Sequence, residues 1–475
     1  MNSKSRADSV PRRSREGGTN LQRTGQQSCG PTMKWNTRRL GDPDVAMLVM
    51  GQSPPSRTYN NQESGLPFFQ GKADFGYINP TARVWCSEPR RTGQAGDILM
   101  SVRAPVGDVN LATEACVLGR GLAAIRSAVG TNSTYLFYSL QFSKPQLVAA
   151  SSGAIFESIN KTALHDLEIS LPPLVEQEKI AAILWKLQRA IATQDRLIAV
   201  TGDLKQSAMQ RLFTHGLRGE PLKDTEIGPM PESWQVATIG KIAKLSAGGT
   251  PSRSNPEFWS GGTIPWVKTG EINYGLILDT EEKITPCGLK RSAAKLLPRG
   301  TLLVAMYGQG ITRGKAAILG IEAATNQACA AIRPDEEKVR TDFLFHVLAH
   351  GYERLRGLAH GGQQQNLNAD LIRGFAFGYP RDIDEQRDIA AALATIDRKL
   401  AHHRAKRAAL DALFQTTLHQ LMTAQVRVTD LDIDISEVTD HVPDAGKVIE
   451  EVAGDTDHVV DANKMIQRGQ SRARR

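Results

Sequence analysis

The sequence predicts an α+β protein: two mixed α/β domains separated by two long antiparallel helices that form a coiled coil. Two stretches with near-heptad apolar spacing, residues 176–214 and 385–423, predict the helices. The second follows the first at a constant offset, because Glu385-Gln386 repeats Glu176-Gln177 (385 − 176 = 209). A duplication of this size predicts pseudo-two-fold symmetry, and the most economical partner for each apolar stripe is the other helix.

Composition fits a protein of two or three domains. The 475 residues exceed what one core accommodates, and 40% hydrophobic and 23% charged residues are ordinary for a soluble chain. No apolar run is long enough to span a membrane or resembles a signal peptide, so we expect a cytoplasmic protein. The five cysteines are scattered, which argues against zinc and a disulfide framework. A net charge of +8 only weakly favours a polyanionic partner.

The first third of the chain predicts a tail and a domain. Residues 1–34 are rich in Arg, Ser, Gly and Gln and predict a disordered basic tail, with Met33 as a second candidate start. Residues 35–172 predict the first domain. Within it, residues 97–102 and 121–127 predict buried strands, and residues 131–143 predict a capped helix.

The rest of the chain predicts helix, domain, helix and tail. The first spacer helix, residues 173–216, begins after Pro172-Pro173 and ends at His215-Gly216. Residues 217–380 predict a connector and a second domain that loosely repeats the first. The second spacer helix occupies residues 381–424. The periodic stretch in each helix, about 38 residues, corresponds to roughly 57 Å. Residues 425–475 predict a disordered acidic tail.

Two polar residues occupy equivalent places near the middle of the helices. Gln194 and His403 are related by the same offset (403 − 194 = 209). In an antiparallel pair with two-fold symmetry they should face each other, at some cost in stability but fixing the register. The alternative is that each lies at the edge of the seam in water.

No catalytic or metal-binding motif emerges. The segment GQGITRGKA (residues 308–316) has the wrong spacing for a phosphate loop, and NPEF (residues 255–258) lacks the second proline of an adenine methyltransferase motif. The one adjacent histidine pair, His402-His403, points in different directions on a helix. We therefore predict no catalytic residues, no metal and no cofactor bound by this chain.

Each domain carries glycine-rich polar loops suited to reading DNA. Arg and Lys can contact guanine or phosphate, and Gln can read adenine. Taken singly, such side chains are more often solvated or turn-stabilising residues, but two similar polar faces on a rigid spacer suit double-stranded DNA. We expect Trp259, Trp266, Phe68 and Phe69 in the core. The candidate DNA-binding residues are Arg57, Tyr59, Gln70, Lys72 and Arg103 in the first domain, and Arg253, Lys268, Thr269, Tyr307, Gln309, Arg313 and Lys315 in the second.

The chain resembles the specificity subunit of type I restriction-modification enzymes from Trp35 to about Thr423. The strings that carry the resemblance are SPPSRTYNNQESGLPFFQGKADFG, GGTPSRSNPEFWSGGTIPWVKTGEIN, LPPLVEQEKIAAIL and THGLRGEPLKDTEIGPMPESW. The resemblance implies that each domain reads half of a split DNA site and that the helices set the spacing and bind the other subunits. S-adenosylmethionine would belong to modification subunits, and ATP and magnesium to restriction subunits.

Three alternatives remain open from the sequence. The first is a specificity subunit of a methylation-only complex, which neighbouring genes would distinguish. The second is a self-contained DNA nuclease or methyltransferase, which would turn over DNA alone with magnesium and S-adenosylmethionine. The third is a purely structural coiled-coil scaffold, which would lack DNA affinity even with its partners.

Overall fold

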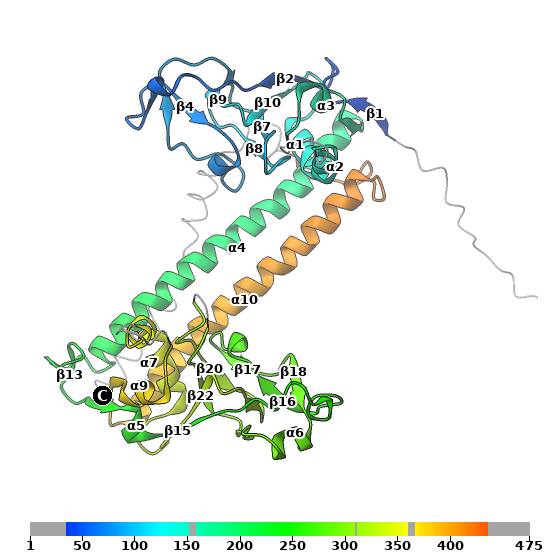
Figure 1. The fold of residues 1–475 in the computed structure, drawn as a ribbon. Coiled ribbons are helices and arrows are strands. Elements are labelled where there is room, and N and C mark those ends of the chain that lie inside the picture. Colours follow the sequence, from blue (N-terminus) through cyan, green and yellow to red (C-terminus); the bar gives the residue numbers. More distant parts are fainter. Residues whose placement is uncertain (1–34, 152–157, 309–310, 360–365, 436–475) are drawn as a thin grey trace, which may run out of the picture.

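Two long helices form the axis of the molecule in the computed structural model, which describes residues 35–151, 158–308, 311–359 and 366–435 (Figure 1). Helix α4 (Leu174–His215) and helix α10 (Ile383–Met422) lie side by side and run in opposite directions. Ion pairs cross the seam from Lys205 to Asp397 (2.5 Å) and from Arg407 to Asp195 (3.2 Å). The predicted antiparallel pair is confirmed.

The signals predicted for the two ends of the first spacer helix are confirmed, and the second helix has a side-chain cap of its own. Pro173 precedes α4, and Gly216 ends it with φ of 62°, a left-handed conformation that favours glycine. Asp382 caps α10 by accepting a hydrogen bond from the backbone N–H of Asp384. These signals explain why both helices run about forty residues without interruption.

The first domain combines two sheets with a covering helix. One sheet has the order β2-β10-β7-β8, the other has the order β3-β5-β4-β9-β6, and a separate ribbon pairs β1 with β11. The predicted capped helix is α1, where Asn132 accepts from the Tyr135 N–H. Its strands are β1 (Asn36–Arg39), β2 (Ala46–Met50), β3 (Tyr59–Asn60), β4 (Leu66–Phe69), β5 (Trp85–Cys86), β6 (Thr92–Gly93), β7 (Ile98–Ser101), β8 (Val109–Leu111), β9 (Cys116–Leu118), β10 (Leu122–Ser127) and β11 (Glu168–Leu171), and its helices are α1 (Ser133–Phe142), α2 (Lys144–Ser151) and α3 (Lys161–His165).

The second domain repeats this topology. Its main sheet, β15-β22-β19-β20-β17, begins with the same strand order as β2-β10-β7-β8, and its ribbon β14-β23 corresponds to β1-β11. Its strands are β12 (Leu222–Lys223), β13 (Met230–Pro231), β14 (Gln235–Thr238), β15 (Ala243–Ala247), β16 (Ile264–Val267), β17 (Leu276–Ile277), β18 (Glu282–Ile284), β19 (Leu302–Ala305), β20 (Ala316–Leu319), β21 (Ala324–Thr325), β22 (Cys329–Pro334) and β23 (Ala376–Tyr379), and its helices are α5 (Ile239–Ile242), α6 (Pro286–Lys290), α7 (Thr341–His350), α8 (Tyr352–Gly357) and α9 (Ala369–Gly374). The internal duplication inferred from sequence is thus present in the fold.

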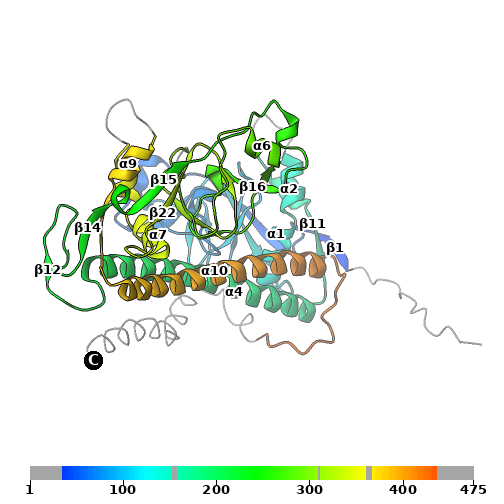
Figure 2. The ribbon, with the colours of Figure 1, turned by 90° about the horizontal axis from the view of Figure 1, so that it is seen from below.

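Each domain shares a core with one end of both helices. The first core joins domain 1 to Trp185 of α4 and Phe414 of α10. The second joins domain 2 to Leu212 of α4 and Leu393 of α10. Figure 2 shows both domains on the same side of the helix pair. Because each domain is packed on two helices rather than one, the fold holds the domains at a defined separation.

The segment after α10 differs from the prediction. The sequence predicts residues 425–435 as the start of a disordered tail, and that prediction is wrong: Val428 is 1% exposed, and Ile433 and Ile435 pack on the first core. Lys179 of α4 donates to the Thr429 carbonyl (2.7 Å), and Arg427 pairs with Glu176. We call residues 425–435 the strap. The predicted tails at residues 1–34 and 436–475 lie outside the described residues.

Candidate functional site

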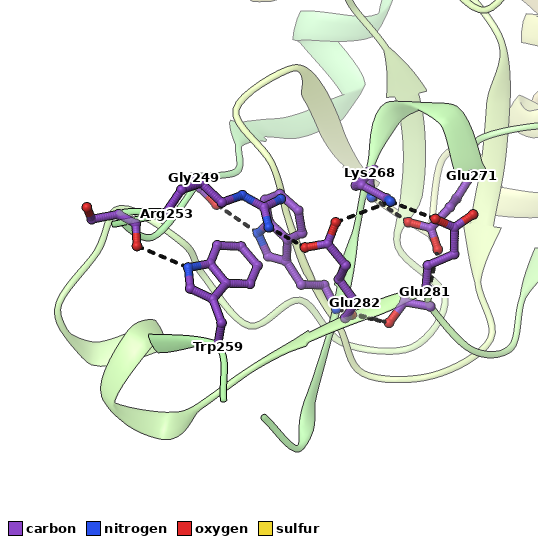
Figure 3. A network of polar contacts seen from close by, with 10 residues as sticks. Gly249, Arg253, Trp259, Lys268, Glu271, Glu281 and Glu282 are labelled. Atoms are coloured by element: carbon purple, nitrogen blue, oxygen red, sulfur yellow. Dashed lines mark hydrogen bonds and ion pairs between the residues drawn. The ribbon is translucent and has the colours of Figure 1, made fainter. Parts of the chain in front are cut away.

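A stacked arginine dominates the candidate loops of domain 2 (Figure 3). The Arg253 guanidinium lies 3.8 Å from the ring centroid of Trp259 and 4.9 Å from that of Trp266, and it pairs with Glu282. Each tryptophan is fixed in turn, because its indole N–H donates to a backbone carbonyl, that of Ser252 or Gly249 (both 3.0 Å). Trp266 is buried as predicted, whereas Trp259 is partly exposed and supports Arg253. Stacking and ion pairing together restrict the arginine to a narrow range of directions.

Carboxylates balance the positive charge of Lys268, the second cation of this cluster. Lys268 Nζ lies 2.6 Å from Glu281 and 3.2 Å from Glu282, and Glu271 accepts hydrogen bonds from the backbone N–H groups of Lys268 (2.6 Å) and Glu281 (2.9 Å). The Glu281 hydrogen bond raises the pKa of Lys268, and the Arg253 hydrogen bond lowers the pKa of Glu282. The cluster is therefore charged but not strongly basic. Such pairs orient side chains more than they attract phosphate from a distance.

Most of the remaining candidates of domain 2 follow β19, whereas Thr269 lies beside Lys268. Lys315 Nζ donates to Asn273 Oδ1 (2.6 Å), Tyr307 is 43% exposed, and Arg313 is half-buried. Thr269 opens a short 3-10 turn beside Lys268. Gln309 lies outside the described residues. Accordingly, this segment forms a second group separate in sequence from the Arg253 cluster.

The candidates of domain 1 are more dispersed. Arg57 is 78% exposed and lies 4.0 Å from Glu88, and Gln70 is exposed just after β4. Arg103 is also exposed, on a bridge to Ser158. The Tyr59 hydroxyl donates to the Pro54 carbonyl (2.8 Å) and its ring lies 4.6 Å from that of Phe68. Tyr59 thus holds its loop in place, and burial raises the pKa of its hydroxyl.

Lys72 shares a carboxylate with a second lysine. Asp108 lies 2.8 Å from Lys72 Nζ and 2.7 Å from Lys144 Nζ. Burial alone would raise the pKa of Asp108, but the hydrogen bonds from Lys144 and Lys72 outweigh it and lower that pKa. Since two lysines face one carboxylate, the group keeps a net positive charge that can contact phosphate.

At the middle of the spacer, Gln194 and His403 meet. His403 Nδ1 lies 3.0 Å from Gln194 Oε1, and Gln194 is 5% exposed. An amide oxygen only accepts, so this contact places a proton on Nδ1 of the imidazole. Burial, followed by the charges of His402 and nearby lysines, lowers the pKa of His403. The predicted contact across the axis is present, and its role in register stays a prediction.

Sequence reasoning missed the anchors at the start of each spacer helix. Gln177 accepts from the Asn132 N–H (2.9 Å) and donates to the Pro172 carbonyl (2.9 Å). Gln386 repeats this pattern with the Arg340 N–H (2.9 Å) and the Pro380 carbonyl (2.8 Å). Both glutamines are buried. The Glu-Gln repeat was visible in the sequence, but only the structure shows that these amides tie each helix to its domain.

A second pair of anchors joins each helix to the segment that follows the other. Glu176 pairs with Arg427 of the strap, and Glu385 pairs with Arg218 of the connector (3.2 Å). The two arginines obey the same offset (427 − 218 = 209). Pseudo-symmetry therefore extends beyond the helices into the segments that leave them.

A family model of the type I restriction modification DNA specificity domain matches residues 34–200 and 231–412. The chain belongs to this family. The two matches cover both domains and most of both spacer helices. In the described parts of the chain, no helix is long and apolar enough to cross a membrane, and no cluster of three or more His, Cys, Asp or Glu residues could hold a metal ion.

Several relatives of this chain are named as specificity subunits of type I restriction enzymes. The putative type I restriction enzyme MjaX specificity subunit of Methanocaldococcus jannaschii is 39% identical over 39% of this chain, which is 44% of the length of that relative. The MjaVIII specificity subunit of the same organism is 26% identical over 63% of this chain and 71% of its own. The S subunit structure from M. genitalium superposes with a TM-score of 0.59 at 16% identity, covering 83% of this chain and 97% of that one. A second solved structure, described as the structural basis of complex assembly in the type I R-M system, superposes with a TM-score of 0.50 at 18% identity, covering 83% of this chain and 99% of that one.

Proposed function

We propose that this chain is the non-catalytic DNA sequence-specificity subunit of a type I restriction-modification complex, and that each domain reads one half of a bipartite double-stranded site. One observation carries the proposal: two domains of one topology are fixed at opposite ends of an antiparallel helix pair. A pseudo-two-fold protein presents equivalent loops to two half-sites, just as dimeric DNA-binding proteins do. We assign the first recognition domain to residues 35–172, and the connector together with the second recognition domain to residues 217–380.

Readout differs between the two domains. In domain 2, Arg253 is oriented by Trp259 and Glu282, which suits a bidentate contact to a guanine edge. In domain 1, the Lys72 group keeps excess positive charge and suits a phosphate contact that positions the duplex. The Arg253 cluster thereby contributes base discrimination, and the Lys72 group contributes affinity.

The spacer sets the gap between the half-sites. Helix α10 has 40 residues, which corresponds to about 60 Å. Each domain shares a core with both helices, so the gap cannot change without repacking one of these cores. A fixed gap between half-sites follows.

The catalytic steps belong to partner subunits in this proposal. Modification subunits dock on the spacer helices and transfer methyl groups from S-adenosylmethionine to adenine. Restriction subunits use ATP and magnesium for translocation and cleavage. This chain binds none of these cofactors and acts in the cytoplasm. The complex-assembly structure among its relatives supports docking of such partners.

Single-molecule sequencing of methylated adenines tests the proposal. Host DNA should carry a split methylated motif that disappears when the gene for this chain is deleted. Persistence of every methylated motif in the deletion strain would refute it. The purified chain alone, incubated with DNA, magnesium and S-adenosylmethionine, should show no turnover, and any turnover would favour a self-contained enzyme.

A methylation-only complex is the second candidate. It requires the same specificity subunit, so the subunit itself cannot distinguish the two. Challenge of the host with unmodified phage DNA separates them, because only a complex with restriction subunits would reduce infection.

A further inference from the structure

We propose that domain 2 contains a phosphate-binding site, made by Lys241, Lys244 and Arg333, that domain 1 lacks. These side chains line an open pocket of about 690 Å³ formed by residues 240–244 and 333–335. The pocket lies where α5 leads into β15, beside the end of β22. It is separate from the Arg253 cluster and from the segment that contains Lys315.

The three cations face the pocket without compensation. All three are exposed, and among the described residues none has a carboxylate within ion-pair distance. Asp335, the acidic residue in the lining, is already paired with Lys338 (2.9 Å). Lys244 and Arg333 are direct partners in the antiparallel β15-β22 pair. Like charges at directly opposed positions destabilise a sheet, so this arrangement costs stability unless an anion neutralises it.

Domain 1 shows the same framework with the charge removed. The register Met47↔Arg126 in the β2-β10 pair matches the register Lys244↔Arg333, so methionine replaces the lysine. Arg126 is held by Asp97 through two hydrogen bonds of 2.7 and 2.8 Å. Asp97 directly precedes β7, and the residue that directly precedes the equivalent strand β19 is Thr301. The absence of that carboxylate from domain 2 is what leaves Arg333 available.

Phosphate is the ligand that this chemistry favours, and DNA is its first source. The inference about DNA rests on the function proposed above. The pocket is at the start of β15, whereas the loop that contains Arg253 follows the end of the same strand. Five residues of strand span roughly 16 Å, about five base pairs of duplex at 3.4 Å each. A duplex read by Arg253 is therefore long enough to bring a backbone phosphate to the pocket.

The salt dependence of DNA binding tests the site. The full chain, assembled with its modification subunits, is titrated with a duplex carrying the methylated motif at several salt concentrations. Lys244→Met introduces the residue that domain 1 has at the equivalent position, Met47, so we expect the variant to keep the fold. The slope of log affinity against log salt should fall by about 0.9 for each phosphate that the protein no longer neutralises, equally on target and scrambled duplexes. Lys295→Met, at an exposed lysine of the same domain outside the pocket, is the matched control and should retain a steeper slope than Lys244→Met.

Two further arms identify the source of the phosphate. Shortening the duplex on the side of domain 2 should abolish the difference between wild type and Lys244→Met if DNA supplies the phosphate. If free phosphate is the ligand, inorganic phosphate should raise the melting temperature of wild type but not of Lys244→Met, with equal DNA slopes. Equal slopes together with equal responses to inorganic phosphate would overturn the site. Failure of the proposed function gives a different result: wild type would not prefer the target over the scrambled duplex.

Discussion

Arg427→Ala should destabilise the end of the helix pair next to domain 1. Arg427 donates two hydrogen bonds to Glu176 (2.7 and 2.8 Å), and the Glu176 side chain is 1% exposed. Without the arginine, that carboxylate would stay buried and uncompensated. Removing one partner of a buried ion pair costs about 3–5 kcal/mol. Arg427 is itself 35% exposed, which places the cost near the lower end, about 3 kcal/mol.

Thermal unfolding followed by circular dichroism measures this destabilisation. For domains of 150–250 residues each kcal/mol shifts the midpoint by roughly 2–4 °C, so the transition that includes domain 1 should fall by about 6–12 °C. Truncation after Thr423 should lower it at least as much, since Val428 is then missing too.

Two variants separate the ion pair from general damage to the strap. Adding Glu176→Gln to Arg427→Ala should restore most of the missing stability, because the buried charge is then absent. Arg218→Ala is the matched control at the equivalent site. There Glu385 still accepts from the Leu217 N–H (3.2 Å) and the Trp234 indole N–H (3.3 Å), so the destabilisation should be smaller. An unchanged midpoint in Arg427→Ala, or no rescue by Glu176→Gln, would refute this reasoning.

Three other predictions concern the seam, a buried histidine and the loops. Replacing both Gln194 and His403 with leucine should raise the melting temperature yet broaden the range of gap lengths that the complex binds; a lower melting temperature or an unchanged gap preference would contradict the register role. Burial lowers the pKa of His346 to about 4, below its unfolded value near 6.5. The stability that depends on neutral His346 is therefore fully present above pH 6.5. It is lost as the pH falls towards 4, by about 3 kcal/mol. The melting temperature should accordingly fall more between pH 7 and pH 5 in the wild type than in His346→Gln. Lys72→Ala and Arg313→Ala should each weaken DNA binding by about 1–3 kcal/mol with unchanged circular dichroism, and unaltered affinity in both would assign them to solvated loops.

The spacer was predictable from sequence because its signals are local and repeated. Heptad spacing, Pro172-Pro173 and His215-Gly216 determine where the first helix begins and ends, and α4 spans Leu174–His215. The constant offset then predicts the second helix and, through antiparallel symmetry, the Gln194–His403 contact. Helix periodicity and internal duplication can both be read from a single sequence, so the two spacer helices and their pairing could be predicted without knowledge of tertiary contacts.

Other features depend on contacts between residues far apart in the chain. The strap places apolar residues such as Val428, Ile433 and Ile435 among three aspartates, and only the structure shows that these apolar side chains pack on the first core and that Arg427 pairs with Glu176. The ion pair between Arg253 and Glu282, 29 residues further along the chain, depends on how two separate segments of domain 2 pack together. The pocket of domain 2 depends on a carboxylate being absent next to Arg333, which is visible only when strand registers are compared.

A domain exchange tests the central claim most directly. Residues 35–172 are replaced by the corresponding domain of a specificity subunit with a different target, and methylated adenines are mapped by single-molecule sequencing. Independent readout predicts that one half of the motif changes while the other half and the gap remain the same. A change in both halves, or no change in either, would contradict the account.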